Sequence, residues 1–222
     1  MRERTCRTAL FILLTSLALL TPGAACTFAR SVTLGFWFED VTYQSSHFGG
    51  PLSSGERLLL GRVATAEIEA AFAGLRIRLT DQHDARYRVR VVQHLNDPRF
   101  RGSVAVAGAS RAVSMFGGDG AVNFSMLAAY ADSYAPADAD RAAIVTAIGR
   151  GVGRAAVHEF VHQLLGSGEF DGTRDPNTYE YGSAARKEQY YGALHWGPTW
   201  ELLQRRFGTA PPSSGTPRSS AR

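Results

Sequence analysis

The stretch GRAAVHEFVHQLLG, residues 153–166, decides how this chain of 222 residues is interpreted. It contains two histidines four residues apart, His158 and His162, and Glu159 follows the first of them directly. Residues four apart share one face of a helix, so both imidazoles can bind the same tetrahedral zinc ion. Zinc lowers the pKa of a bound water molecule towards 7, and the Glu159 carboxylate can accept the proton of that water. The stretch therefore predicts a zinc site with its own general base.

The residues around this motif predict one long helix from Arg141 to Leu165. Asp138 or Asp140 is suited to cap its N-terminus, and Gly166 can end it in a left-handed conformation. Glycines recur between residues 149 and 153 and weaken the helix locally. We expect them to allow close packing of the helix on a sheet.

The chain ahead of this helix predicts a sheet. Apolar residues recur at helical spacing over residues 56–72. Period-two alternation and β-branched or aromatic residues predict strands at 32–38, 75–79, 87–91, 103–113 and 121–126. We expect the arginines of the second and third strands to face water, and the strand at 121–126 to lie at the sheet edge. With a further helix at 200–207, the fold class is α+β: a mixed twisted sheet packed on the motif helix, followed by a small, mostly helical and loop C-terminal subdomain.

The N-terminal residues 1–29 predict a secretory signal separate from the domain. A basic leader precedes an apolar run too short for a permanent membrane span, and small residues would allow cleavage after Ala25 or Ala29. Cleavage before Cys26 would instead expose a thiol to which lipid attaches, and this would tether the protein to a membrane. We expect the domain to occupy residues 30–208 and the tail, 209–222, to be disordered.

Charge and cysteine content exclude two classes of interpretation. The formal net charge is +4 at pH 7, but the leader and the tail account for all of it. The domain has no cluster of basic and aromatic residues of the kind that binds nucleic acid. Because Cys6 and Cys26 both precede the domain, a disulfide framework is excluded as well. We expect a monomeric domain of bacterial composition.

A catalytic zinc site needs a third protein ligand, and here that ligand must come from beyond the end of the helix. The loop that follows offers acidic side chains, and the later part of the chain offers more acids and a histidine. The candidates are Glu169, Asp171, Asp175, Glu180, Glu188 and His195. Each acid could instead cap a turn or face water.

Aromatic residues and one histidine gather near the end of the domain. His195, Tyr179 or Tyr181 could stabilise the oxyanion that forms on a substrate carbonyl, and we favour His195. The alternative role of these tyrosines, shared with Trp196 and Trp200, is to pack the C-terminal helix on the core.

The HExxH motif and the order of elements resemble the N-terminal subdomain of zincin metallopeptidases, with metzincins nearest. The metzincin spacing is displaced: it requires a glycine at 165 and a ligand at 168, but this chain has Leu165 followed by Gly166, and Gly168 at the ligand position. Asp171, three residues after Gly168, imitates the glycine-then-aspartate turn of some short bacterial metzincins, and we favour it as the third ligand. No methionine follows the motif to form a Met-turn, and the branch is left unassigned.

A second resemblance concerns the loop after the helix. Residues 172–175, GTRD, are similar to the GTxDxxYG motif of aspzincins, although the Tyr-Gly pair at 181–182 comes several residues later than in that motif. In zincins the edge strand lies antiparallel to the bound substrate, which would assign residues 121–126 to peptide binding.

Three hypotheses follow for the function. The leading one is an extracytoplasmic, secreted or periplasmic zinc metallopeptidase that acts on a peptide or protein, either free or lipid-anchored through Cys26. The second is a non-catalytic exported zinc-binding protein of the cell envelope, which would need the two histidines but not Glu159. The third is a structural domain in which the motif is accidental.

Overall fold

The computed structural model describes residues 31–44, 50–95, 107–112, 117–166 and 173–209. Within them, five strands form one mixed sheet in the order β2-β1-β3-β5-β4. The strands are β1 (Val32–Glu39), β2 (Ile77–Thr80), β3 (Tyr87–Val92), β4 (Gly108–Ala112) and β5 (Gly118–Asn123). β4 pairs antiparallel with β5, and the other neighbours are parallel. The predicted leader, residues 1–29, and the tail beyond Thr209 lie outside the described residues.

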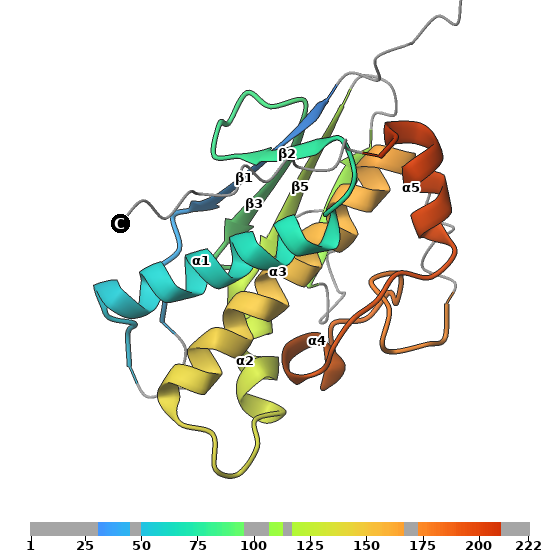
Figure 1. Cartoon of the computed structure of the whole chain (residues 1–222). Helices are drawn as coiled ribbons and strands as arrows, with labels where there is room; N and C mark the ends of the chain where they lie inside the picture. The colour runs from blue at the N-terminus through green and yellow to red at the C-terminus, as the bar shows by residue number, and fades with distance from the viewer. Residues whose placement is uncertain (1–30, 45–49, 96–106, 113–116, 167–172, 210–222) are drawn as a thin grey trace, which may run out of the picture.

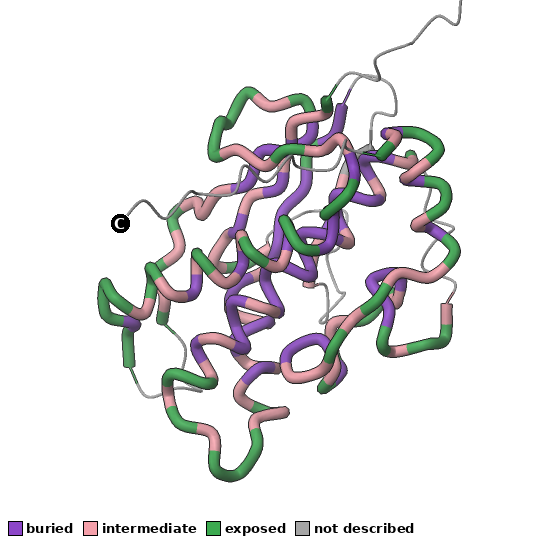
Figure 2. The backbone as a smooth tube through the Cα atoms, viewed as in Figure 1, coloured by how far each residue is buried: buried purple, intermediate pink, exposed green. Residues whose placement is uncertain are grey.

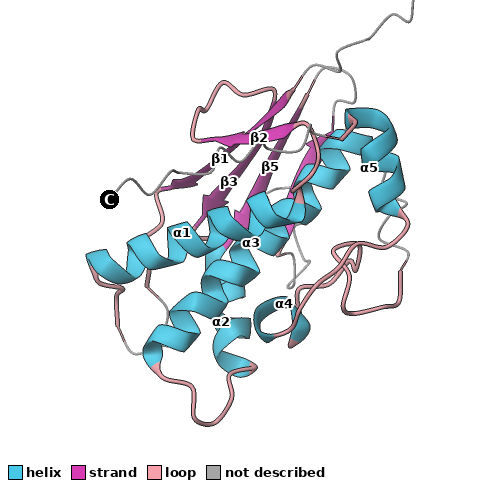
Figure 3. Ribbon diagram, viewed as in Figure 1, coloured by secondary structure: helices cyan, strands magenta, loops and turns pink. Residues whose placement is uncertain are grey.

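Two long helices cover one face of this sheet (Figures 1 and 3). The helices are α1 (Ser54–Ala71), α2 (Phe124–Ser133), α3 (Arg141–Leu165), α4 (Glu188–Tyr191) and α5 (Thr199–Phe207). α1 starts at a capping box, in which the Ser53 hydroxyl accepts from the Glu56 N–H and the Glu56 carboxylate accepts from the Ser53 N–H. The α+β class with a mixed sheet is confirmed.

The core lies between the sheet and the two long helices, α1 and α3, where the tube in Figure 2 is coloured as buried. In β3 the alternation is regular: Tyr87, Val89 and Val91 are buried, and the residues between them are partly exposed. Arg88 pairs with Asp119, and Arg90 pairs with Glu39 across the opposite face of the sheet. The prediction that aliphatic residues face inward and arginines face water is confirmed for this strand.

Helix α3 matches its predicted bounds. The Asp140 carboxylate caps its first turn by accepting from the Ala143 N–H at 2.7 Å. Gly166 ends the helix with φ 69°, a left-handed conformation that glycine adopts without strain. Most of the helix is buried, because the sheet lies on one side and other helices lie on the rest.

The glycines of α3 do not face the sheet, and that prediction is wrong. A Cβ at Gly149 would lie 2.8 Å from the Leu60 carbonyl oxygen, and one at Gly153 would lie 2.5 Å from the Ala64 carbonyl oxygen. These glycines therefore let α3 approach the backbone of α1. Gly151 instead contacts the ring of Tyr190, which comes from α4.

The predicted edge strand, 121–126, is also wrong in position and length. β5 ends at Asn123 and lies inside the sheet, between β3 and β4, so the edges of the described sheet are β2 and β4. The Asn123 side chain accepts from the Met126 N–H and caps α2, a helix that the sequence reading missed. This capping turns the chain out of the sheet after residue 123.

No helix within the described ranges is long and apolar enough to cross a membrane.

Candidate metal site

The two motif histidines lie together on the face of α3, as predicted. Their ring centroids are 4.9 Å apart, and the ring planes are nearly perpendicular, at 84°. Both residues are partly buried, whereas Glu159 between them is only 5% exposed. Two imidazoles one helical turn apart, with a sheltered carboxylate beside them, fit a zinc site by the chemistry of their donor atoms.

A backbone carbonyl holds the ring of His158. Its Nδ1 lies 3.0 Å from the Tyr179 carbonyl oxygen. A carbonyl oxygen can only accept, so Nδ1 must carry the proton, and in the neutral ring the lone pair then lies on Nε2. This is the arrangement by which proteins orient a metal-binding histidine, and it makes Nε2 the donor atom towards a metal.

The edge strand β4 passes directly beside the Glu159 carboxylate. A Cβ built at Gly108 would lie 2.4 Å from Oε1 of Glu159 and 2.9 Å from its Cδ. Only glycine at position 108 lets the strand backbone come this close to that side chain. Gly108 thus forms one wall of the space that the carboxylate occupies.

One turn further along α3, Gln163 joins the helix to the sheet. Its side chain is fully buried; it accepts from the Arg88 N–H at 3.0 Å and donates to the Arg88 carbonyl at 2.9 Å. It also donates to the Ser110 hydroxyl, which in turn donates to the Glu159 carbonyl oxygen at 3.1 Å. These bonds fix the motif turn of α3 against β3 and β4.

The third ligand is not assigned by the described residues. Asp171, which we favoured, and Glu169 lie outside them. Within the described part of the chain, no group of three or more His, Cys, Asp or Glu side chains is arranged to hold a metal ion.

Two other candidate ligands have structural partners. Glu180 is 2% exposed and accepts from the N–H groups of Gly197 and Thr199, so its carboxylate holds the start of α5. Asp175 accepts from the backbone N–H of Asn177, which lowers the pKa of the Asp175 carboxyl. The carboxylate of Asp175 thus caps a turn.

The candidates for oxyanion stabilisation lie in the same C-terminal layer. His195 is largely exposed, with its Nε2 3.5 Å from a carboxylate oxygen of Asp175. The Tyr179 ring packs on Trp196 with centroids 4.7 Å apart, and burial raises its pKa. Tyr181 lies against the guanidinium of Arg186. These contacts give both tyrosines a packing role, and the role of His195 stays a prediction.

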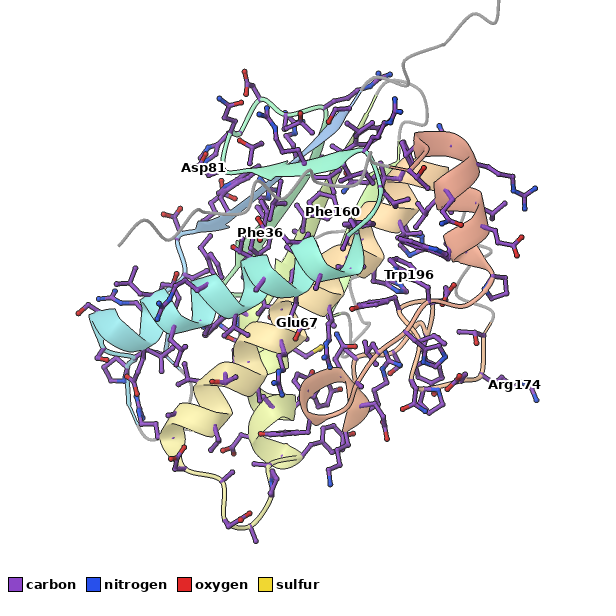
Figure 4. The ribbon with its side chains drawn as sticks, in the orientation of Figure 1. Phe36, Glu67, Asp81, Phe160, Arg174 and Trp196 are labelled. Atoms are coloured by element: carbon purple, nitrogen blue, oxygen red, sulfur yellow. The ribbon has the colours of Figure 1, made fainter. Side chains whose placement is uncertain are left out.

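Trp196, labelled in Figure 4, and the backbone of Glu188 join this layer to the long helices. The indole N–H of Trp196 donates to the Ala71 carbonyl at the end of α1, at 2.7 Å. The carbonyl oxygen of Glu188 accepts from Arg154 of α3 at 2.8 Å. The C-terminal segment is thereby attached to both long helices.

The sequence reading missed Gly108, Ser110, Gln163 and the Tyr179 carbonyl. Gln163 directly follows the motif, and its position inside a buried helix was the one available signal. A strand glycine and a backbone carbonyl have no comparable signature.

No protein-family model matches this chain, and no curated protein is significantly similar to it in sequence.

Proposed function

We propose that this protein is a zinc-dependent hydrolase that cleaves peptide bonds. The observation that carries the proposal is the arrangement on α3: two adjacent imidazoles, one of them fixed by a carbonyl, with a buried carboxylate between them. A pair of surface histidines without function would need neither the buried Glu159 nor the glycine wall beside it.

His158 and His162 would hold the zinc ion, and a third ligand would come from beyond Gly166. Asp171 is still the favoured residue. The donor set fits zinc, which in proteins prefers imidazole and carboxylate ligands. Bound there, zinc would supply Lewis acidity that activates a water molecule and polarises a carbonyl.

The protein's own groups would then carry out the proton transfers. The Glu159 carboxylate accepts a proton from the attacking water and can return it to the leaving amine. Gly108 borders that carboxylate from the side of the sheet, and the Ser110 hydroxyl holds the backbone of the same residue by donating to the Glu159 carbonyl oxygen. The Tyr179 carbonyl keeps His158 in one tautomer.

The finer fold assignment belongs to the same proposal. A β-α-β-β-β-β run, followed by α2 and then by the helix that carries HExxH, resembles the zincin N-terminal subdomain. In zincins the edge strand lies antiparallel to the bound substrate, and the edge strand beside Glu159 is β4. We therefore propose β4, in place of residues 121–126, as the strand that pairs with a peptide.

We further propose that the protein acts as a monomer outside the cytoplasm, secreted or periplasmic, with Cys26 as the attachment point if it is lipid-anchored. The apolar leader supports export.

The Glu159→Gln variant tests hydrolysis. Wild type and variant are incubated with peptides from an unfolded protein, and cleavage is followed by mass spectrometry. We expect cleavage to fall at least 100-fold in Glu159→Gln while bound zinc is retained, and to be unchanged in Glu201→Gln, an exposed glutamate on α5. Zinc binding without cleavage by the wild type would instead favour the exported zinc-binding protein.

A further inference from the structure

The segment 176–179 lies in the loop between α3 and α4, drawn in orange in Figure 1, and each of its four carbonyl groups bonds to a residue outside the segment. The carbonyls of Pro176 and Thr178 accept from the guanidinium of Arg186. The carbonyl of Asn177 accepts from the His195 N–H at 2.9 Å. The Tyr179 carbonyl accepts from Nδ1 of His158. Thr178 makes an isolated bridge with His195, and the residues on either side of it form turns.

Arg186 is a buried residue, unlike most arginines, which lie at the surface of a protein. It is 7% exposed, and besides the two carbonyls it donates to the Gln189 side chain at 2.9 Å. Gln189 in turn donates to the Gly151 carbonyl of α3. Burial lowers the pKa of Arg186 to about 10, so the guanidinium is still protonated at neutral pH. The charged guanidinium group can therefore donate strong hydrogen bonds to the carbonyl oxygens of Pro176 and Thr178.

The geometry of the guanidinium explains why arginine occupies this position. Its donors lie in one rigid plane, so a single side chain can hold carbonyls two residues apart in a fixed orientation. Holding Pro176 and Thr178 on one side sets the rotation of the peptide planes between and after them. The Tyr179 carbonyl is thereby aimed at Nδ1 of His158.

We propose that Arg186 is a positioning residue for the metal site: it orients segment 176–179 so that the Tyr179 carbonyl holds His158 in the Nδ1-protonated tautomer and presents Nε2 to zinc. This inference rests on the proposed zinc site for its purpose, but the tautomer itself can be measured without metal. Loss of a partner that orients a metal-binding histidine weakens metal affinity by about 10- to 100-fold.

The test variant is Arg186→Lys, which replaces the planar guanidinium group with a single ammonium group. The matched control is Arg141→Lys. Arg141 likewise bonds one side-chain oxygen, in the Glu56 carboxylate, and one backbone carbonyl, but at the opposite end of α3. Two-bond 15N NMR spectra of the histidine rings report the tautomer of His158 in the metal-free protein at pH 8. Zinc affinity is measured by competition with a chelator.

We expect the wild type and Arg141→Lys to show His158 protonated at Nδ1. Arg186→Lys should show a mixture of tautomers, together with zinc affinity at least tenfold weaker. A folded Arg186→Lys with an unchanged His158 spectrum would overturn the inference, whatever the zinc affinity. If Arg186→Lys does not fold, Arg186→Gln is judged by the same spectrum. A wild type that binds no zinc would end the proposed function, while the tautomer would still decide the role of Arg186.

Discussion

Replacing Gly108 with alanine should disable Glu159 without removing zinc. The new Cβ would lie 2.4 Å from Oε1 of Glu159 and within 3.0 Å of its Cγ and Cδ. The strand backbone cannot withdraw easily, because β4 is paired with β5 along its whole described length. The carboxylate must therefore move by about 1 Å to restore an ordinary van der Waals contact.

We expect a larger effect on the rate of peptide cleavage than on the stability of the protein. A displacement of about 1 Å of a catalytic group can cost about 100-fold in rate. The atoms that clash belong to the end of a flexible side chain, so the stability cost should lie near the lower end of the 1–3 kcal/mol that is typical of overpacking. Zinc content should not change, since neither histidine ring is among the atoms nearest to the new methyl group.

The assay compares peptide cleavage, zinc content and urea denaturation for Gly108→Ala and the control Gly61→Ala. Gly61 lies within α1, where a Cβ meets nothing closer than 4.0 Å. The control should keep full activity and gain up to about 1 kcal/mol from helix propensity. Gly108→Ala with wild-type activity, or with a loss of activity explained by lost zinc, would refute the reasoning.

Two predictions concern stability. Gln163→Leu removes the three hydrogen bonds of a fully buried side chain and leaves the Arg88 N–H and carbonyl without these partners, so the free energy of unfolding should fall by about 2–4 kcal/mol. The control Gln82→Leu, at an exposed position, should change the free energy of unfolding by less than about 0.5 kcal/mol. Equal effects of the two substitutions in urea titrations would contradict this prediction. The Arg141 side chain and the Ser53 N–H lower the pKa of Glu56 from 4.5 to about 2, so stability from this group is present above pH 4.5 and is lost towards pH 2. Glu56→Gln should therefore lose less stability than wild type between pH 5 and 3, and an identical pH slope would argue against the pairing.

The sequence predicted best those elements whose signals are local. The Asp140 cap, the motif and Gly166 all lie within α3, and its bounds were predicted correctly. The position of strand 121–126 was wrong because strand order depends on contacts between distant segments, which alternation along one strand does not encode. The start of α2 was missed because Asn123 serves both as the last residue of a strand and as a helix cap.

The same difference between local signals and long-range contacts applies to the candidate site. The spacing of His158 and His162 was sufficient to place both imidazoles together. Gly108 comes from a strand about fifty residues earlier, and the Tyr179 carbonyl from a loop about twenty residues later, so neither contact follows from spacing. Glu180 looked like a ligand, but its buried carboxylate holds the backbone at the start of α5.

The central claim, that His158 and His162 bind zinc, is tested most directly by the metal content of the purified protein. Wild type, His162→Ala and His94→Ala, an exposed histidine outside the motif, are loaded with zinc, dialysed and analysed for metal. We predict one zinc ion per chain in the wild type and in His94→Ala, and none in His162→Ala. A wild type without zinc, or a His162→Ala variant that keeps it, would contradict the claim.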